Sequence, residues 1–203
     1  MVPMRLELRR QPVTFTFVMS ILTVNLKRHL TALGLAMWLC GPVLADDRTD
    51  QLFETLRNGP EEEAKRAARD IERSWARSGS ASMDLLLKRG RDALEIGEIS
   101  QAIDHLTALT DHAPMFAEGF HARAMAYFQA DLYGPALDDL ETALALNPDN
   151  YRAIYGLAVM FMELGDTRRA AQLFRRALSI NPYLENATDA LEHLKRDGIG
   201  RTL

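Results

Sequence analysis

Pro114, Pro148 and Pro182 follow one another at intervals of 34 residues, and the residues around them repeat with the same period. Small residues recur twelve and twenty-four positions before each proline: Ala102, Ala136 and Ala170, and Gly90, Ala124 and Ala158. A period of this length is typical of helix–turn–helix solenoids, in which each unit covers the apolar face of the next. The period therefore predicts an all-α chain with three repeated units, 83–116, 117–150 and 151–184.

Each unit is predicted to contain two helices separated by a turn. The first helix carries apolar residues at helical spacing, for example Ala124 and Tyr127. Gly97, Asp131 and Gly165 occupy one matching position after it, where a glycine can adopt the left-handed conformation that ends a helix. The proline that closes each unit cannot continue a helix, so it forces a turn into the next unit.

This pattern resembles the tetratricopeptide repeat family over residues 83–184. The positions that match best in the second and third units are Phe120, Ala124, Tyr127, Ala136, Leu140, Ala143 and Pro148, and Leu157, Ala158, Phe161, Ala170, Phe174, Ala177 and Pro182. The first unit departs from the family pattern at Arg89, Ala93 and Leu109. The resemblance implies a right-handed superhelical solenoid of stacked helix-turn-helix repeats with terminal capping helices.

The first 45 residues have the pattern of a secretory signal. Lys27 and Arg28 precede the apolar stretch 30–39, and Val43 and Ala45 form a cleavage motif after a helix breaker. The apolar stretch is shorter than the roughly 20 residues that a membrane span requires. We therefore expect cleavage after Ala45 and a periplasmic chain that has no membrane span in its mature part.

Two alternatives to cleavage after Ala45 are an uncleaved membrane anchor and a lipoprotein anchor at Cys40, which the bulky Leu39 before it disfavours. The start of translation is also open among Met1, Met4 and Met19, which give leaders of different length.

Removal of the leader makes the chain acidic. Residues 1–45 hold five of the 24 basic residues and one of the 28 acidic residues, which leaves 19 basic and 27 acidic residues and a net charge of −8. This charge argues against a nucleic acid partner, because binding to a phosphate backbone requires basic surface. The only cysteine, Cys40, also lies in the leader, so the mature chain is predicted to have neither disulfides nor thiol chemistry.

Helical segments of different composition flank the repeats. Residues 46–82 predict a helical hairpin that is broken at Gly59 and carries Ile71 and Trp75 on its apolar stripe. This hairpin matches the repeat poorly, and we interpret it as a degenerate N-terminal cap. Residues 185–203 predict a capping helix with a frayed tail, because a stack of repeats leaves its last apolar face bare.

No catalytic motif is recognisable, so we expect a protein that is not an enzyme and that holds no cofactor. His105, His112 and His121 could form a metal cluster, or they could be three unrelated histidines. We favour the second interpretation and expect no metal, because no cysteine or closely spaced His–carboxylate pattern accompanies them.

The resemblance implies a binding surface instead, since the first helix of each repeat lines a concave groove in this family. The corresponding positions here give the candidate groove residues Leu87, Arg91, His121, Met125, Phe128, Arg152, Tyr155, Val159 and Met162. Their aromatic and methionine side chains suit an extended peptide or a partner helix. The alternative is that they pack between neighbouring repeats, and some residues are expected to do both.

Members of the family that dock chaperones clamp a terminal carboxylate with lysines and asparagines in this groove. Leu87, Arg91, His121 and Met125 stand along the corresponding helices here, with no asparagine among them. A carboxylate clamp is therefore not expected, although Arg91 and Arg152 could still contact one acidic group.

Together these features predict a non-catalytic scaffold or adaptor of the bacterial cell envelope that binds a protein or peptide partner. In this respect the chain is similar to small periplasmic repeat proteins of Gram-negative bacteria. The alternative is a regulatory subunit of an envelope enzyme, for example one that remodels peptidoglycan. The identity of the partner and the oligomeric state do not follow from the sequence.

Overall fold

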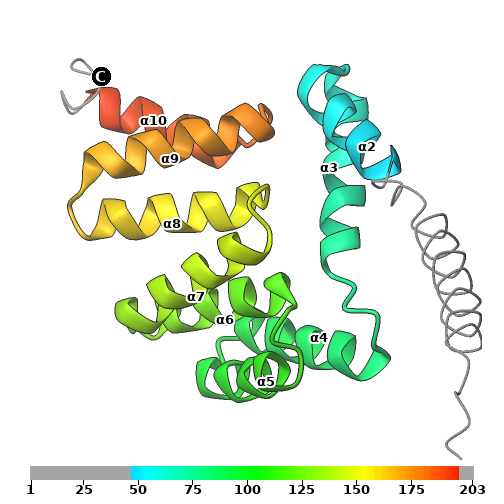
Figure 1. Cartoon of the computed structure of the whole chain (residues 1–203). Helices are drawn as coiled ribbons and strands as arrows, with labels where there is room; N and C mark the ends of the chain where they lie inside the picture. The colour runs from blue at the N-terminus through cyan, green and yellow to red at the C-terminus, as the bar shows by residue number, and fades with distance from the viewer. Residues whose placement is uncertain (1–46, 197–203) are drawn as a thin grey trace, which may run out of the picture. The chain divides into compact units, whose positions relative to one another are not determined.

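A computed structural model describes residues 47–196, and this part of the chain is entirely helical (Figure 1). The helices are α2 (Asp47–Asn58), α3 (Glu61–Trp75), α4 (Ala81–Glu95), α5 (Ile99–His112), α6 (Ala117–Gln129), α7 (Tyr133–Leu146), α8 (Tyr151–Glu163), α9 (Thr167–Ile180) and α10 (Glu185–Arg196). They belong to one compact unit, and the predicted all-α class is confirmed. The predicted leader, 1–45, and the predicted tail, 197–203, lie outside the described residues.

Each repeated unit contributes a pair of antiparallel helices, α4 with α5, α6 with α7 and α8 with α9 (Figure 1). The first helix of each pair is followed by a residue in the left-handed conformation, with φ of 81° at Gly97, 60° at Asp131 and 79° at Gly165. Aspartate tolerates this conformation better than most residues that have a Cβ atom, so it can replace glycine in the second unit. The predicted left-handed ends are therefore confirmed at all three positions.

Small residues let the two helices of a pair approach closely. Ala102, Ala136 and Ala170 have no exposed surface. In the first unit the approach is close at Gly90 on α4, where an added Cβ would lie only 2.4 Å from Cγ of Leu106 on α5. The first unit consequently needs glycine at the position where the other two units have alanine.

Two helices of the third unit begin with a side-chain cap. Oδ1 of Asn150 accepts hydrogen bonds from the backbone N–H groups of Arg152 and Ala153 at 3.2 and 3.1 Å. Oδ1 of Asp166 accepts one from the backbone N–H of Arg169 at 3.0 Å. A cap of this kind stabilises a helix by about 1 kcal/mol, so both helices of this pair have defined starting points.

The N-terminal hairpin of α2 and α3 packs against the third unit, across the start of α8 and the end of α9 (Figure 1). Leu56 and Ile71 of the hairpin share a core with Tyr151 of α8 and Ala177 of α9. The ring of Trp75 lies 5.3 Å from the ring of Tyr151. The two expected helices are present, but the surface that they cover belongs mainly to the third unit and not to α4, which follows them in the sequence.

Helix α10 covers the last face of the stack. Ala187, Leu191 and Leu194 are buried in one cluster with Ala158 and Phe174 of the third unit. The residues on the other side of α10 are polar and exposed, as expected of a helix that ends a stack. Among the described helices, none combines the length and the hydropathy that a membrane span needs.

Candidate functional site

A cavity of about 350 Å³ opens between α6, α8 and the first turn of α10. Six of the nine candidate groove residues line this cavity: His121, Met125, Phe128, Arg152, Tyr155 and Val159. They occupy matching positions of two consecutive first helices, so the repeat period brings them to one surface. The other residues that line the cavity are Ala124, Leu140, Gly156, Met160, Leu184 and Asn186.

The rings of Phe128 and Tyr155 form much of the apolar wall, and each of them packs against a second aromatic ring. The ring of Phe128 lies 5.7 Å from the ring of Tyr133, and the ring of Tyr155 lies 5.6 Å from that of Phe174. Met125 is 42% exposed, and its flexible thioether can adapt to the shape of a ligand. The cavity therefore combines two fixed rings with one adaptable apolar side chain.

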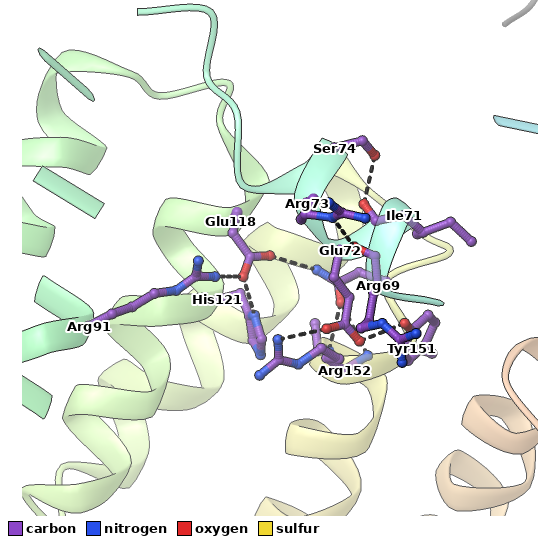
Figure 2. A network of polar contacts seen from close by, with 12 residues as sticks. Arg69, Ile71, Glu72, Arg73, Ser74, Arg91, Glu118, His121, Tyr151 and Arg152 are labelled. Atoms are coloured by element: carbon purple, nitrogen blue, oxygen red, sulfur yellow. Dashed lines mark hydrogen bonds and ion pairs between the residues drawn. The ribbon is translucent and has the colours of Figure 1, made fainter. Parts of the chain in front are cut away.

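A buried polar network lies beside this wall (Figure 2). Glu118 is only 3% exposed and accepts hydrogen bonds from Nη2 of Arg91 and, at 3.3 Å, from Nδ2 of Asn150. Nδ1 of His121 lies 3.2 Å from Oε1 of the same carboxylate. Burial disfavours the charged form of Glu118, but the hydrogen bond with His121 and the positive charges around it outweigh burial. The pKa of Glu118 is therefore lowered, and the carboxylate is ionised at neutral pH.

Glu72 of α3 connects the hairpin to two residues at the start of α8, Tyr151 and Arg152 (Figure 2). The hydroxyl of Tyr151 donates a hydrogen bond to Oε1 of Glu72 at 2.7 Å, and Nη1 of Arg152 lies 3.4 Å from Oε2. Burial, followed by the hydrogen bond to this carboxylate, raises the pKa of Tyr151 far above its usual range, so the phenol stays neutral. Arg152 lines the cavity and is at the same time paired with the hairpin.

A second hollow of about 250 Å³ adjoins the cavity and shares His121, Met125 and Arg152 with it. Arg91, the seventh candidate groove residue, lines this hollow together with Leu94. The two depressions therefore form one continuous surface along α4, α6 and α8.

Two candidates do not line either depression. Leu87 is 2% exposed and packs in the core of the first unit with Ala122 and Ala126. These alanines on α6 leave room for a large side chain from α4, so the expectation that Leu87 lines the groove is corrected. Met162 is half-buried and packs against the cluster that contains Phe174.

Two further residues of this surface, Glu118 and Asn186, stand outside the nine candidates, although the sequence carries a signal for both. Glu118 and His121 are three residues apart, a spacing that places two side chains on the same face of a helix. Asn186 follows Arg152 by 34 residues, as Arg152 follows Glu118, so one repeat position supplies all three.

The histidines do not meet at a common point. His105 and His112 belong to α5, whereas His121 belongs to α6 and pairs with Glu118. Within residues 47–196, no group of three or more histidine, cysteine, aspartate or glutamate side chains is arranged to hold a metal ion.

The fold and the groove define the class of the protein, a helical-repeat solenoid with a groove along α4, α6 and α8. A family model described as tetratricopeptide repeat matches residues 121–185, which cover most of the second unit and the whole third unit. The tetratricopeptide repeats that the period of the prolines and small residues predicted are therefore confirmed.

Several known proteins resemble this chain. A TPR repeat-containing protein of Rhizobium etli is 29% identical over 148 residues, which are 72% of each chain. Protein bimA of Emericella nidulans is 33% identical over 82 residues, which are 40% of this chain and 10% of that protein. The solved structure of the first TPR of Spaghetti (RPAP3) bound to the HSP90 peptide SRMEEVD has a TM-score of 0.55 at 25% identity and covers 58% of this chain and 94% of that one. The structure of MamA has a TM-score of 0.54 at 23% identity and covers 70% and 86%.

These similarities suggest a scaffold for protein–protein interactions, because the RPAP3 repeat domain is solved with a bound peptide. A segment of the same fold also occurs in the O-GlcNAc transferase of Thermobaculum terrenum, of which this chain covers only 22%. The fold alone therefore carries no catalytic activity over to this chain.

Proposed function

We propose that this protein is a non-catalytic scaffold or adaptor of the bacterial cell envelope that binds a peptide or a helix of a partner protein in the cavity between α6, α8 and α10. The cavity itself carries the proposal. Its apolar lining comes from matching positions of consecutive repeats, and its volume of about 350 Å³ lies within the range of about 300–1,000 Å³ that is usual for binding pockets.

The pairing of the charged residues in the groove favours a partner that is recognised through its apolar side chains. Both arginines of this surface are already paired within the chain, Arg91 with Glu118 and Arg152 with Glu72. An acidic peptide, such as the one bound to RPAP3, would have to displace these carboxylates. An apolar side chain can enter the cavity without breaking either pair, so the partner is bound mainly by burial of apolar surface.

The envelope location rests on the sequence of residues 1–45, with its basic cluster, short apolar stretch and cleavage motif at Val43 and Ala45. The similarity to a bacterial protein of comparable length agrees with a bacterial role. N-terminal sequencing of the exported protein should find Asp46 as the first residue. An intact Met1 or Met19 in the exported protein would overturn this part of the proposal.

Met125 offers the sharpest test of the binding surface, because Phe128 and Tyr155 also pack inside the repeats. Partners are first captured by crosslinking in the native envelope and identified by mass spectrometry. Met125→Glu places a charge in the cavity and should weaken capture of the main partner at least about tenfold, because a buried unpaired charge is costly. Met115→Glu is the matched control, since Met115 is 79% exposed and lies outside the cavity.

Both variants should keep their thermal stability within about 0.5 kcal/mol, because neither position is buried. Equal capture of the partner by the two variants would place the binding surface outside this cavity.

A further inference from the structure

We infer that the cavity selects an aromatic side chain that carries a hydrogen-bond donor, the indole of tryptophan or the phenol of tyrosine, and that Nε2 of His121 accepts this hydrogen bond. The inference rests on the function proposed above, and it specifies the chemistry of the side chain that binds in the cavity.

His121 is the one side chain that is both buried and polar among those that line the cavity. Its Nδ1 pairs with Glu118, whereas Nε2 has no hydrogen-bond partner among residues 47–196. Every side-chain nitrogen or oxygen of these residues that is sealed from solvent has a hydrogen-bond partner. Nε2 is therefore not sealed, and because the ring lines both the cavity and the adjoining hollow, a ligand in this groove can reach it.

Glu118 determines which nitrogen of the ring can accept a hydrogen bond. An ionised carboxylate has no hydrogen to donate, so in the neutral imidazole Nδ1 carries the hydrogen and Nε2 keeps its lone pair. Arg91 and Asn150 also donate to Glu118 and hold the carboxylate in place. In the neutral imidazole, the network thus presents an acceptor at the side of a largely apolar cavity.

A side chain that fits this cavity needs an apolar ring and one donor. Tyrosine and tryptophan have both, and their O–H and N–H groups usually find a partner when they are buried. Phenylalanine fills the same space but covers Nε2 without bonding to it, which leaves a buried acceptor unsatisfied. Binding sites that hydrogen-bond a ligand reject the analogue that lacks the polar group much more strongly than they reject a small change in apolar size.

The test uses the full-length protein and three probes, the N-acetyl amides of tryptophan, tyrosine and phenylalanine. Binding is followed by NMR of methionine methyl groups, because Met125 and Met160 line the cavity and Met115 does not. We expect the tryptophan and tyrosine probes to shift the Met125 and Met160 signals, to leave Met115 unchanged, and to bind about tenfold more tightly than the phenylalanine probe. His121→Leu removes the acceptor and should bring the three affinities together.

The comparison among probes in the unsubstituted protein needs no variant, so it holds even if His121→Leu fails to fold. Equal binding of all three probes at Met125 and Met160 would overturn the inference and leave the cavity as a general apolar site. Absence of any shift at these methionines would count against both the inference and the proposed binding function.

Discussion

The three repeats and the N-terminal hairpin are all pairs of short helices, yet they find their packing partners differently. Each repeat packs against the units next to it in the sequence, so the second unit contacts the first and the third. The hairpin instead packs against the third unit, and its Glu72 bonds to Tyr151, which lies 79 residues further along the chain. A repeated sequence therefore indicates which units pack against each other. The sequence of the hairpin, which has no such period, indicates an apolar face but not the surface that covers it.

The largest expected effect tests whether the hairpin is a full part of the fold. Ile71 has no exposed surface and lies in the core shared with the third unit. Ile71→Ala should therefore lower the free energy of unfolding by about 2–5 kcal/mol. Ile96→Ala is the control and should change it by less than about 0.5 kcal/mol, because Ile96 is 76% exposed. If chemical denaturation of Ile71→Ala left the main unfolding transition unchanged, the hairpin would be only loosely attached.

A smaller effect tests the register of the repeats. Ala170 has no exposed surface and allows α8 and α9 to approach, so Ala170→Leu should overpack the pair and cost about 1–3 kcal/mol. Ala145→Leu on the exposed side of α7 should have almost no effect. Equal melting temperatures for the two variants would show that the alignment of the units is wrong.

The smallest effect concerns the contact between Tyr151 and Glu72. Tyr151→Phe should cost about 1 kcal/mol near neutral pH, because Glu72 is only half-buried and water can replace the lost donor. The folded state raises the pKa of Tyr151, so it binds this proton more tightly than the unfolded state does. The contribution is therefore complete below about pH 10, the usual pKa of tyrosine, and declines as the pH rises above it.

Unfolding curves measured between pH 7 and pH 11 should show a steeper alkaline loss of stability for the unsubstituted protein than for Tyr151→Phe. Parallel pH profiles would mean that burial and the contact with Glu72 do not hold Tyr151 neutral in the folded protein.

The sequence predicted the helices, the left-handed turns and most of the groove, because all of these follow from local spacing or from the repeat period. It misplaced Leu87, since groove positions and packing positions lie on adjacent faces of α4 and only the alanines of α6 decide between them. It could not name the partner of the hairpin, because Leu56 and Ile71 indicate an apolar face without indicating what covers it. The network around Glu118 depends on contacts between two helices, α4 and α6, and the loop residue Asn150, which spacing within a single helix does not reveal.

The position of the hairpin also has a consequence for folding. An open stack of repeats has only nearest-neighbour interfaces, so it can lose its terminal units one at a time. Here α4 to α7 lie between two segments that are fixed to each other, the hairpin and the third unit. The first unit is therefore not a free end of the stack that can unfold by itself. We expect the described helices to unfold with higher cooperativity than an open array of the same length. The same closure requires a long loop of chain to come together, so docking of the hairpin should be the slow step in folding.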